Sequence, residues 1–131
     1  MSAISLGNAT LLVALGGGLG AAGRFHLGRL ALQFFGPGWP WGTLIANVSG
    51  GFLMGCLVGI LAQQASGGES WRLLIGVGLL GGFTTFSAFS LETANMVMRG
   101  EWGVAAGYAL LSVIASVAAL FGGLMLARLW A

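Results

Sequence analysis

The segment at residues 81–92, GGFTTFSAFSLE, carries residue types that could handle ions within an apolar stretch of the chain. Two adjacent glycines and two adjacent threonines form helix poorly, because glycine is flexible and Thr hydroxyls compete for backbone groups. We therefore expect the helix to break between Gly81 and Thr85. Non-helical backbone at membrane depth persists only where it is buried in protein or lines a wet cavity, so the freed carbonyl oxygens indicate an ion or solute site.

Three side chains follow the expected break at three-residue intervals, namely Phe86, Phe89 and Glu92. This spacing places them along one helix face. Two phenylalanines at helical spacing are also what ordinary packing produces, so packing is the alternative to a role in an ion pathway. Acids inside membrane helices are rare and are functional candidates, although Glu92 is near enough to the end of its segment to reach water.

The composition is that of an integral membrane protein. Of 131 residues, 57% are hydrophobic and only 6% are charged, and the mean hydropathy is +0.96, whereas soluble domains have about 25% charged residues. A membrane-spanning helix needs about 20 apolar residues. The chain therefore has room for four spans, and we expect one all-α transmembrane domain over residues 1–131.

Several function classes are excluded by what the chain contains. Its five basic and three acidic residues are too few and too scattered for a nucleic-acid surface. No CxxC, HExxH, Walker or paired-carboxylate pattern occurs, so we expect no enzyme activity. Cys56 lies in an apolar run as a small core residue. Residues 1–15 have no basic side chain, so they do not form a cleaved signal peptide and the first span should be retained.

We expect the spans at about residues 4–32, 41–64, 71–98 and 103–129, with a Gly- and Pro-rich turn between the first two. Small residues spaced four apart let membrane helices approach closely. This spacing predicts close packing at Gly16 and Gly20 in the first span, and along a glycine stripe in the second span: Gly51, Gly55 and Gly59.

Polar residues in the first two spans each have two interpretations. Arg24 either extends to the interface to reach water or forms an electropositive vestibule that gathers anions. Asn47 follows Thr43 by four residues on one helix face. Because an amide facing lipid is costly, Asn47 should point inward, either as a hydrogen bond between helices or as a station in a pathway.

The fourth span carries a hydroxyl-bearing face, with Tyr108, Ser112 and Ser116 at successive four-residue steps. Such serines could instead bond to the carbonyl one turn back on their own helix. Because one-sided polar faces in so small a chain cannot enclose a water path alone, we expect a homo-oligomer, most simply a dimer.

The arginines barely specify an orientation in the membrane. With four spans, Arg72 and Arg128 lie towards one side, while Arg24, Arg29 and Arg99 lie towards the other. The positive-inside rule then compares two arginines with three. Such a chain could insert both ways, and a dimer of opposed subunits would be antiparallel.

The chemistry of these side chains suits small ions. Phenylalanine ring edges are electropositive and, with hydroxyl and amide donors, fit a partly dehydrated anion. Carbonyl oxygens at the break fit a hard cation such as Na⁺. The residues alone thus indicate small ions and leave open whether one of them is structural.

Three segments together resemble the signature sequences of the CrcB/Fluc fluoride channels: GAAGRF at 20–25, GTLIANVSGG at 42–51, and residues 81–92. The likeness covers essentially the whole chain. It implies an antiparallel dual-topology homodimer in the bacterial inner membrane, with two pores that export fluoride passively from the cytoplasm. It also implies a central structural Na⁺ held by the backbone carbonyls of Gly81 and Thr84.

The resemblance assigns further roles by position. Asn47 corresponds to the pore asparagine, Phe86 and Phe89 to an aromatic box whose ring edges meet fluoride, and Arg24 to the vestibule charge. The polar track or its surroundings would include Thr43, Tyr108, Ser112, Ser116 and Glu92. The family often has Thr where this chain has Ala88, so we expect a hydroxyl of the third-span polar track to be missing near the aromatic box.

Two other classes are alternatives to a channel. A proton-coupled exporter of the small four-helix multidrug type would also be a dimer, but it needs an acid in its first span, where this chain has none. A membrane assembly subunit without transport activity is the other. Fast passive fluoride flux without a proton gradient separates the channel from both.

Overall fold

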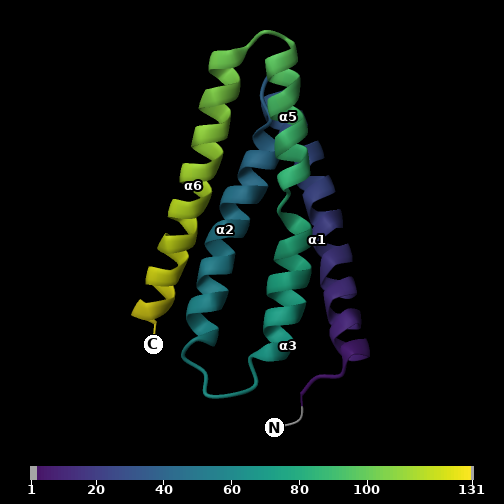
Figure 1. Cartoon of the computed structure of the whole chain (residues 1–131), viewed down its shortest axis with the longest axis vertical. Coiled ribbons are helices and arrows are strands. Elements are labelled where there is room, and N and C mark those ends of the chain that lie inside the picture. The colour runs from purple at the N-terminus through teal and green to yellow at the C-terminus, as the bar shows by residue number, and fades with distance from the viewer. Residues whose placement is uncertain (1–2, 131) are drawn as a thin grey trace.

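The computed structural model describes residues 3–130 as an all-helical bundle of four spans that alternate in direction (Figure 1). All four helical stretches are long and apolar enough to cross a membrane, which confirms the expectation of four spans. The spans converge at the end where α5 meets α6 and spread apart at the other end. Their elements are α1 (Leu6–Phe35), α2 (Trp41–Leu61), α3 (Glu69–Trp71), η1 (Arg72–Leu80), α4 (Gly81–Phe83), α5 (Phe86–Met98) and α6 (Trp102–Leu129).

The turn that joins α1 to α2 begins at Gly36, within the Gly- and Pro-rich stretch where it was predicted. Gly36 has φ +76°, a value that favours glycine, and its N–H donates to the carbonyl of Leu32 at 2.9 Å. Pro37 follows and cannot continue the helix. The short connection places α1 and α2 side by side and antiparallel.

Glycines bring the spans into backbone contact. A Cβ added at Gly16 would overlap the carbonyl of Leu74 in η1, and one at Gly20 would overlap the carbonyl of Leu79. On the other side of the bundle, a Cβ at Gly55 would overlap the carbonyl of Leu120 in α6. The predicted close approach at these glycines is confirmed: α1 packs on η1 and α4, and α2 packs on α6.

We predict that Gly20→Ala destabilises the protein strongly while Gly18→Ala does not. The added methyl group at position 20 would meet backbone, which cannot turn aside, and overpacking typically costs about 1–3 kcal/mol. Gly18 lies on the same helix with nothing within 4 Å of an added Cβ, so alanine there should be neutral or stabilising by up to about 1 kcal/mol. Thermal unfolding in detergent micelles measures both. Equal melting temperatures for the two variants would contradict the close packing.

The first half of the third span differs from a simple α-helix. Residues Arg72–Leu80 form a π-helix, η1, whose turns are wider than the sequence predicts. Gly76 and Gly78 lie within it, and glycine tolerates departures from α geometry. π-Helical turns are rare and often accompany functional sites. Here the wider turns lead directly into the break.

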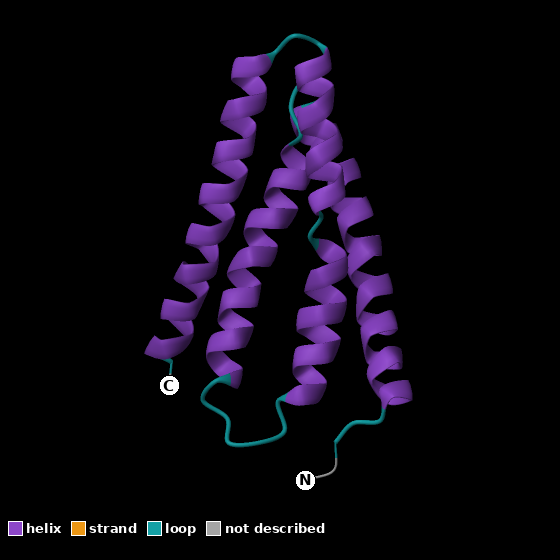
Figure 2. Cartoon of the chain, viewed as in Figure 1, coloured by secondary structure: helices purple, strands orange, loops and turns teal. Residues whose placement is uncertain are grey.

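The helix break itself is confirmed, and it falls at the end of the predicted range. Gly81 and Gly82 are still helical, while Thr84 (φ −83°, ψ 157°) and Thr85 (φ −151°, ψ 125°) are extended. Figure 2 shows this short non-helical link between α4 and α5. The hydroxyl of Thr85 accepts a hydrogen bond from the N–H of Ala88 at 3.1 Å and so caps the start of α5.

Candidate functional site

A cavity of about 400 Å³ opens beside the break, between α2, α5 and α6. We call it the phenylalanine cavity. Residues far apart in the sequence meet in it, and five of them were predicted as pathway residues. These five are Asn47, Phe86, Phe89, Ser112 and Ser116.

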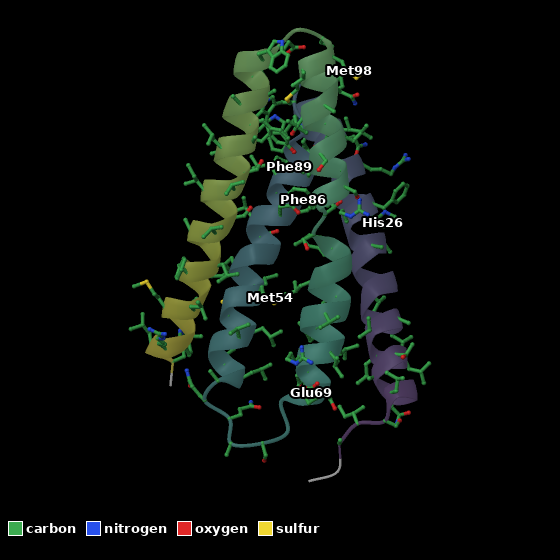
Figure 3. All side chains as sticks on the ribbon, viewed as in Figure 1. His26, Met54, Glu69, Phe86, Phe89 and Met98 are labelled. Carbon is green, nitrogen blue, oxygen red and sulfur yellow. The ribbon has the colours of Figure 1, made fainter. Side chains whose placement is uncertain are left out.

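The two phenylalanines lie just beyond the break on α5 (Figure 3). Their ring centroids are 5.5 Å apart with the planes inclined at 49°. Phe86 is 77% exposed in the single chain, whereas Phe89 is partly buried and packs on Tyr108 with a centroid distance of 5.4 Å. Phe89 therefore packs against the core, while Phe86 is left free for another molecule or an ion.

Ser112 offers an unused hydroxyl to this cavity. The residue is only 6% exposed, and its buried Oγ forms no hydrogen bond of ordinary geometry among residues 3–130. Buried polar groups are nearly always paired, so an orphaned hydroxyl needs an explanation. The alternative in which Ser112 bonds back to its own helix is not what the structure has. An acceptor that enters the cavity would satisfy this group.

A second cavity of about 380 Å³ lies between α1, α2 and α5, and we call it the arginine cavity. Arg24 lines it together with Glu92, and Arg29 was not predicted but also contributes. The Nε of Arg24 is buried and has no hydrogen-bond partner in the described part of the chain. Two guanidinium groups against one carboxylate leave the cavity with an excess of positive charge.

Ala88 lines the arginine cavity and not the phenylalanine cavity. The expectation that a hydroxyl is missing near the aromatic box is therefore wrong in its location, because position 88 faces the cavity that contains the guanidinium groups. The aromatic site keeps its predicted set of polar side chains.

Glu92 links α5 to two neighbouring helices. Thr43 Oγ1 donates to Glu92 Oε1 at 2.6 Å, and Tyr108 OH donates to Glu92 Oε2 at 2.6 Å. Tyr108 is 1% exposed and belongs to the buried core. Glu92 thus points inward, and these three predicted residues form one hydrogen-bonded cluster between the arginine cavity and the ring of Phe89.

Asn47 holds the break through both ends of its amide. Its Oδ1 accepts from the N–H of Thr85 at 2.8 Å, and its Nδ2 donates to the carbonyl of Thr85 at 3.0 Å. Asn47 therefore forms hydrogen bonds from α2 to the third span, which is one of the two roles predicted for it. Because Nδ2 carries two hydrogens, one donor remains for the phenylalanine cavity that Asn47 lines.

The carbonyls of Gly81 and Thr84 lose the donors that a continuous helix would give them. Those donors would be the N–H groups of Thr85 and Ala88. The first donates instead to Asn47 Oδ1, and the second donates to the hydroxyl of Thr85. The break thus presents carbonyl oxygens without their helical partners, which suits a hard cation that binds oxygen ligands.

Among the residues that sequence reasoning did not assign to the site are Arg29, Gly50 and the side chain of Thr85. Gly50 follows Asn47 by three residues, and this spacing places the two on one face of α2. That relation could have indicated Gly50 from the sequence. The cap that Thr85 provides follows the general preference for Thr at helix starts.

The family described as "CrcB-like protein, Camphor Resistance (CrcB)" matches residues 11–124. The "Fluoride-specific ion channel FluC" of Phenylobacterium zucineum (strain HLK1) is 60% identical over 121 residues, which cover 92% of this chain and 95% of that protein.

Proteins with the same printed name in other bacteria are comparably similar. The one from Novosphingobium aromaticivorans is 60% identical over 122 residues, and the one from Caulobacter vibrioides (strain NA1000 / CB15N) is 52% identical over 122 residues. Both alignments cover 92% of this chain and 96% of the relative. These relatives are ion channels and not enzymes, which confirms the expectation that the chain is not an enzyme.

Proposed function

This chain belongs to the CrcB/FluC family of fluoride-specific ion channels, and from that premise we propose that it carries fluoride passively out of the bacterial cytoplasm. The predicted resemblance to the family is confirmed by relatives of 50–60% identity that align over at least 90% of the chain. The observation that carries the proposal is the convergence of predicted pathway residues on one cavity, with the unpaired hydroxyl of Ser112 among them.

Fluoride would enter through the arginine cavity and pass the phenylalanine cavity. The guanidinium groups of Arg24 and Arg29 raise the local anion concentration. Farther along, Ser112 and the free amide hydrogen of Asn47 replace water as hydrogen-bond donors, and the electropositive ring edges of Phe86 and Phe89 line the remaining surface. Weak contacts of this kind suit conduction, because an ion must leave each station as well as enter it.

The conducting unit in this proposal is an antiparallel homodimer with two pores. Phe86 is largely exposed in the single chain although it lines the phenylalanine cavity. We therefore expect a second copy of the chain to bury it. The near balance of arginines, two at one end of the bundle against three towards the other, allows both orientations in one membrane.

The carbonyls of Gly81 and Thr84 would hold a structural Na⁺ between the two subunits. Their helical donors are engaged by Asn47 and by the hydroxyl of Thr85, so the oxygens fit the cation. Bound there, Na⁺ would supply a fixed positive charge and a link between the subunits. Asn47 and Thr85 keep the two carbonyls available by occupying the N–H groups that would otherwise cover them.

Efflux from proteoliposomes tests the function. Vesicles loaded with potassium fluoride and given a potassium ionophore should release fluoride quickly without any pH gradient, while vesicles loaded with chloride should not release chloride. Release that requires a proton gradient would instead favour the exporter class. No release from correctly assembled protein would favour an assembly subunit.

We predict that removing Na⁺ weakens the dimer. Complete replacement of Na⁺ by N-methylglucamine, a cation too large for a carbonyl site, should lower the melting temperature of the purified protein and reduce fluoride efflux. Potassium, which is larger than Na⁺, and lithium, which is smaller, serve as controls for the size selectivity of the carbonyl site. If full replacement by the organic cation changes neither quantity, the sodium site is refuted.

A further inference from the structure

Gly50 on α2 contacts the non-helical link directly. The residue is buried, and a Cβ added to it would overlap the Cγ2 methyl group of Thr84. Its next nearest neighbours, Phe83 Cδ2 at 3.6 Å and Thr84 Cβ at 3.8 Å, are at ordinary contact distances. A single methyl group therefore decides whether position 50 can carry a side chain.

The side chain of Thr84 cannot easily change rotamer to move this methyl group away from position 50. Its Oγ1 donates to the carbonyl of Leu80 at 2.8 Å, which fixes the rotamer, and β-branched side chains have few alternatives at χ1. A larger residue at position 50 would therefore displace the backbone of Thr84 or break this hydrogen bond.

The residues on either side of Thr84 are anchored separately. Gly20 on α1 lies against Phe83, since a Cβ added to Gly20 would lie 2.8 Å from the Phe83 nitrogen. Asn47 holds both the N–H and the carbonyl of Thr85. The Thr84 carbonyl and the Thr85 N–H belong to one planar peptide group, which Asn47 holds at the N–H. A side chain at position 50 that displaces Thr84 would therefore rotate this peptide group about the Asn47 hydrogen bond and move the Thr84 carbonyl.

We propose that Gly50 is a positioning residue for the cation site, and that the absence of a side chain there sets the place of the Thr84 carbonyl. The inference rests on the proposed function, in which this carbonyl is a ligand of Na⁺. It adds that the cation site requires a residue without a side chain at position 50 of α2, because this residue contacts the methyl group of Thr84.

The test is a double-mutant cycle on the full-length protein. Gly50→Ala adds the methyl group at position 50, and Thr84→Ser removes the methyl group it would strike while keeping the hydroxyl. The measured quantity is the Na⁺ concentration that gives half of the maximal thermal stabilisation. Gly50→Ala should raise this concentration by about tenfold or more, which is about 1.4 kcal/mol. The same change made in the Thr84→Ser background should have a much smaller effect.

Gly103→Ala is the matched control, because an added Cβ there has nothing within 4 Å. It should leave the Na⁺ requirement unchanged. If Gly50→Ala prevents assembly at ordinary Na⁺ concentrations, the yield of folded dimer is measured against Na⁺ concentration. A yield that recovers only at high Na⁺ in Gly50→Ala, and at the wild-type Na⁺ concentration in the double variant, supports the proposal, whereas a yield that does not depend on Na⁺ overturns it. An equal effect of Gly50→Ala in both backgrounds, or no effect in either, overturns it.

Fluoride efflux of the wild-type protein, measured in the same preparations, separates the two proposals. A wild-type protein that neither conducts fluoride nor responds to Na⁺ refutes the proposed function. A wild-type protein that does both, while Gly50→Ala leaves the Na⁺ requirement unchanged, refutes only the positioning role of Gly50.

Discussion

Three lysines in the loop between α2 and α3 should force the chain into one orientation and abolish fluoride efflux. The substitutions are Gln64→Lys, Ala65→Lys and Ser66→Lys, at positions that are all exposed. Arg72 begins η1 next to α3, and Arg128 lies in the last turn of α6, so both are at this end of the bundle (Figure 1). Three lysines therefore change the count from two against three to five against three. Orientation follows Lys and Arg near the membrane ends, and an antiparallel dimer cannot form from subunits that all point one way.

A second variant biased in the opposite sense should restore activity when it is co-expressed with the first. Gln33→Lys at the end of α1 and Glu101→Lys before α6 add positive charge at the other end of the bundle. Both residues lie at or near the surface, and the ion pair that Glu101 forms with Arg99 is solvent-exposed, so its loss should cost less than about 1 kcal/mol. Each variant alone should be inactive, and the pair together should conduct.

Neutral changes at the same loop positions provide the control, namely Gln64→Asn, Ala65→Ser and Ser66→Asn. They should leave orientation and efflux as in the wild type. Labelling of a cysteine introduced into this loop, in a variant whose single native cysteine, Cys56, is replaced by Ser, reports orientation in intact cells independently of activity. A lysine variant that is uniformly oriented and still fully active alone would rule out the antiparallel dimer.

The four spans and the broken third helix could be predicted because both follow from local composition. Long apolar runs predict spans, and the GGFTT sequence at residues 81–85 predicts a break because each of its residues weakens helix. The exact place of the break could not be predicted. It depends on Asn47, which lies 38 residues earlier and takes the N–H of Thr85.

The candidate site likewise contains residues that the sequence alone indicates and partners that it does not. Single positions such as Phe86, Ser112 and Glu92 stand out because polar or regularly spaced aromatic residues are conspicuous in an apolar segment. Their partners do not, since the hydrogen bond from Thr43 to Glu92 spans 49 residues and depends on how α2 packs beside α5. The wide turns of η1 also have no signal of their own, because Gly76 and Gly78 are equally compatible with an α-helix in a packed membrane bundle.

Replacing Phe86 by Ile should leave a folded dimer whose fluoride efflux is at least about tenfold slower. Isoleucine keeps most of the apolar volume, and a volume-conserving swap costs less than about 1.5 kcal/mol of stability. It removes a ring edge from the phenylalanine cavity, where that edge offers positive potential to a dehydrated anion. Each loss of about 1.4 kcal/mol at the barrier slows flux tenfold.

Phe89→Ile should slow efflux by a similar factor but should also lower the melting temperature, because Phe89 packs on the buried Tyr108 whereas Phe86 is 77% exposed. This contrast makes Phe86→Ile the cleaner test of anion contact. Phe121→Ile is the matched control, since Phe121 is 59% exposed on α6 and does not line the phenylalanine cavity. Efflux in proteoliposomes and the melting temperature are measured on the same preparations. Near wild-type efflux from a well-folded Phe86→Ile protein would mean that the ring only packs, and the pathway past the two phenylalanines would have to be abandoned.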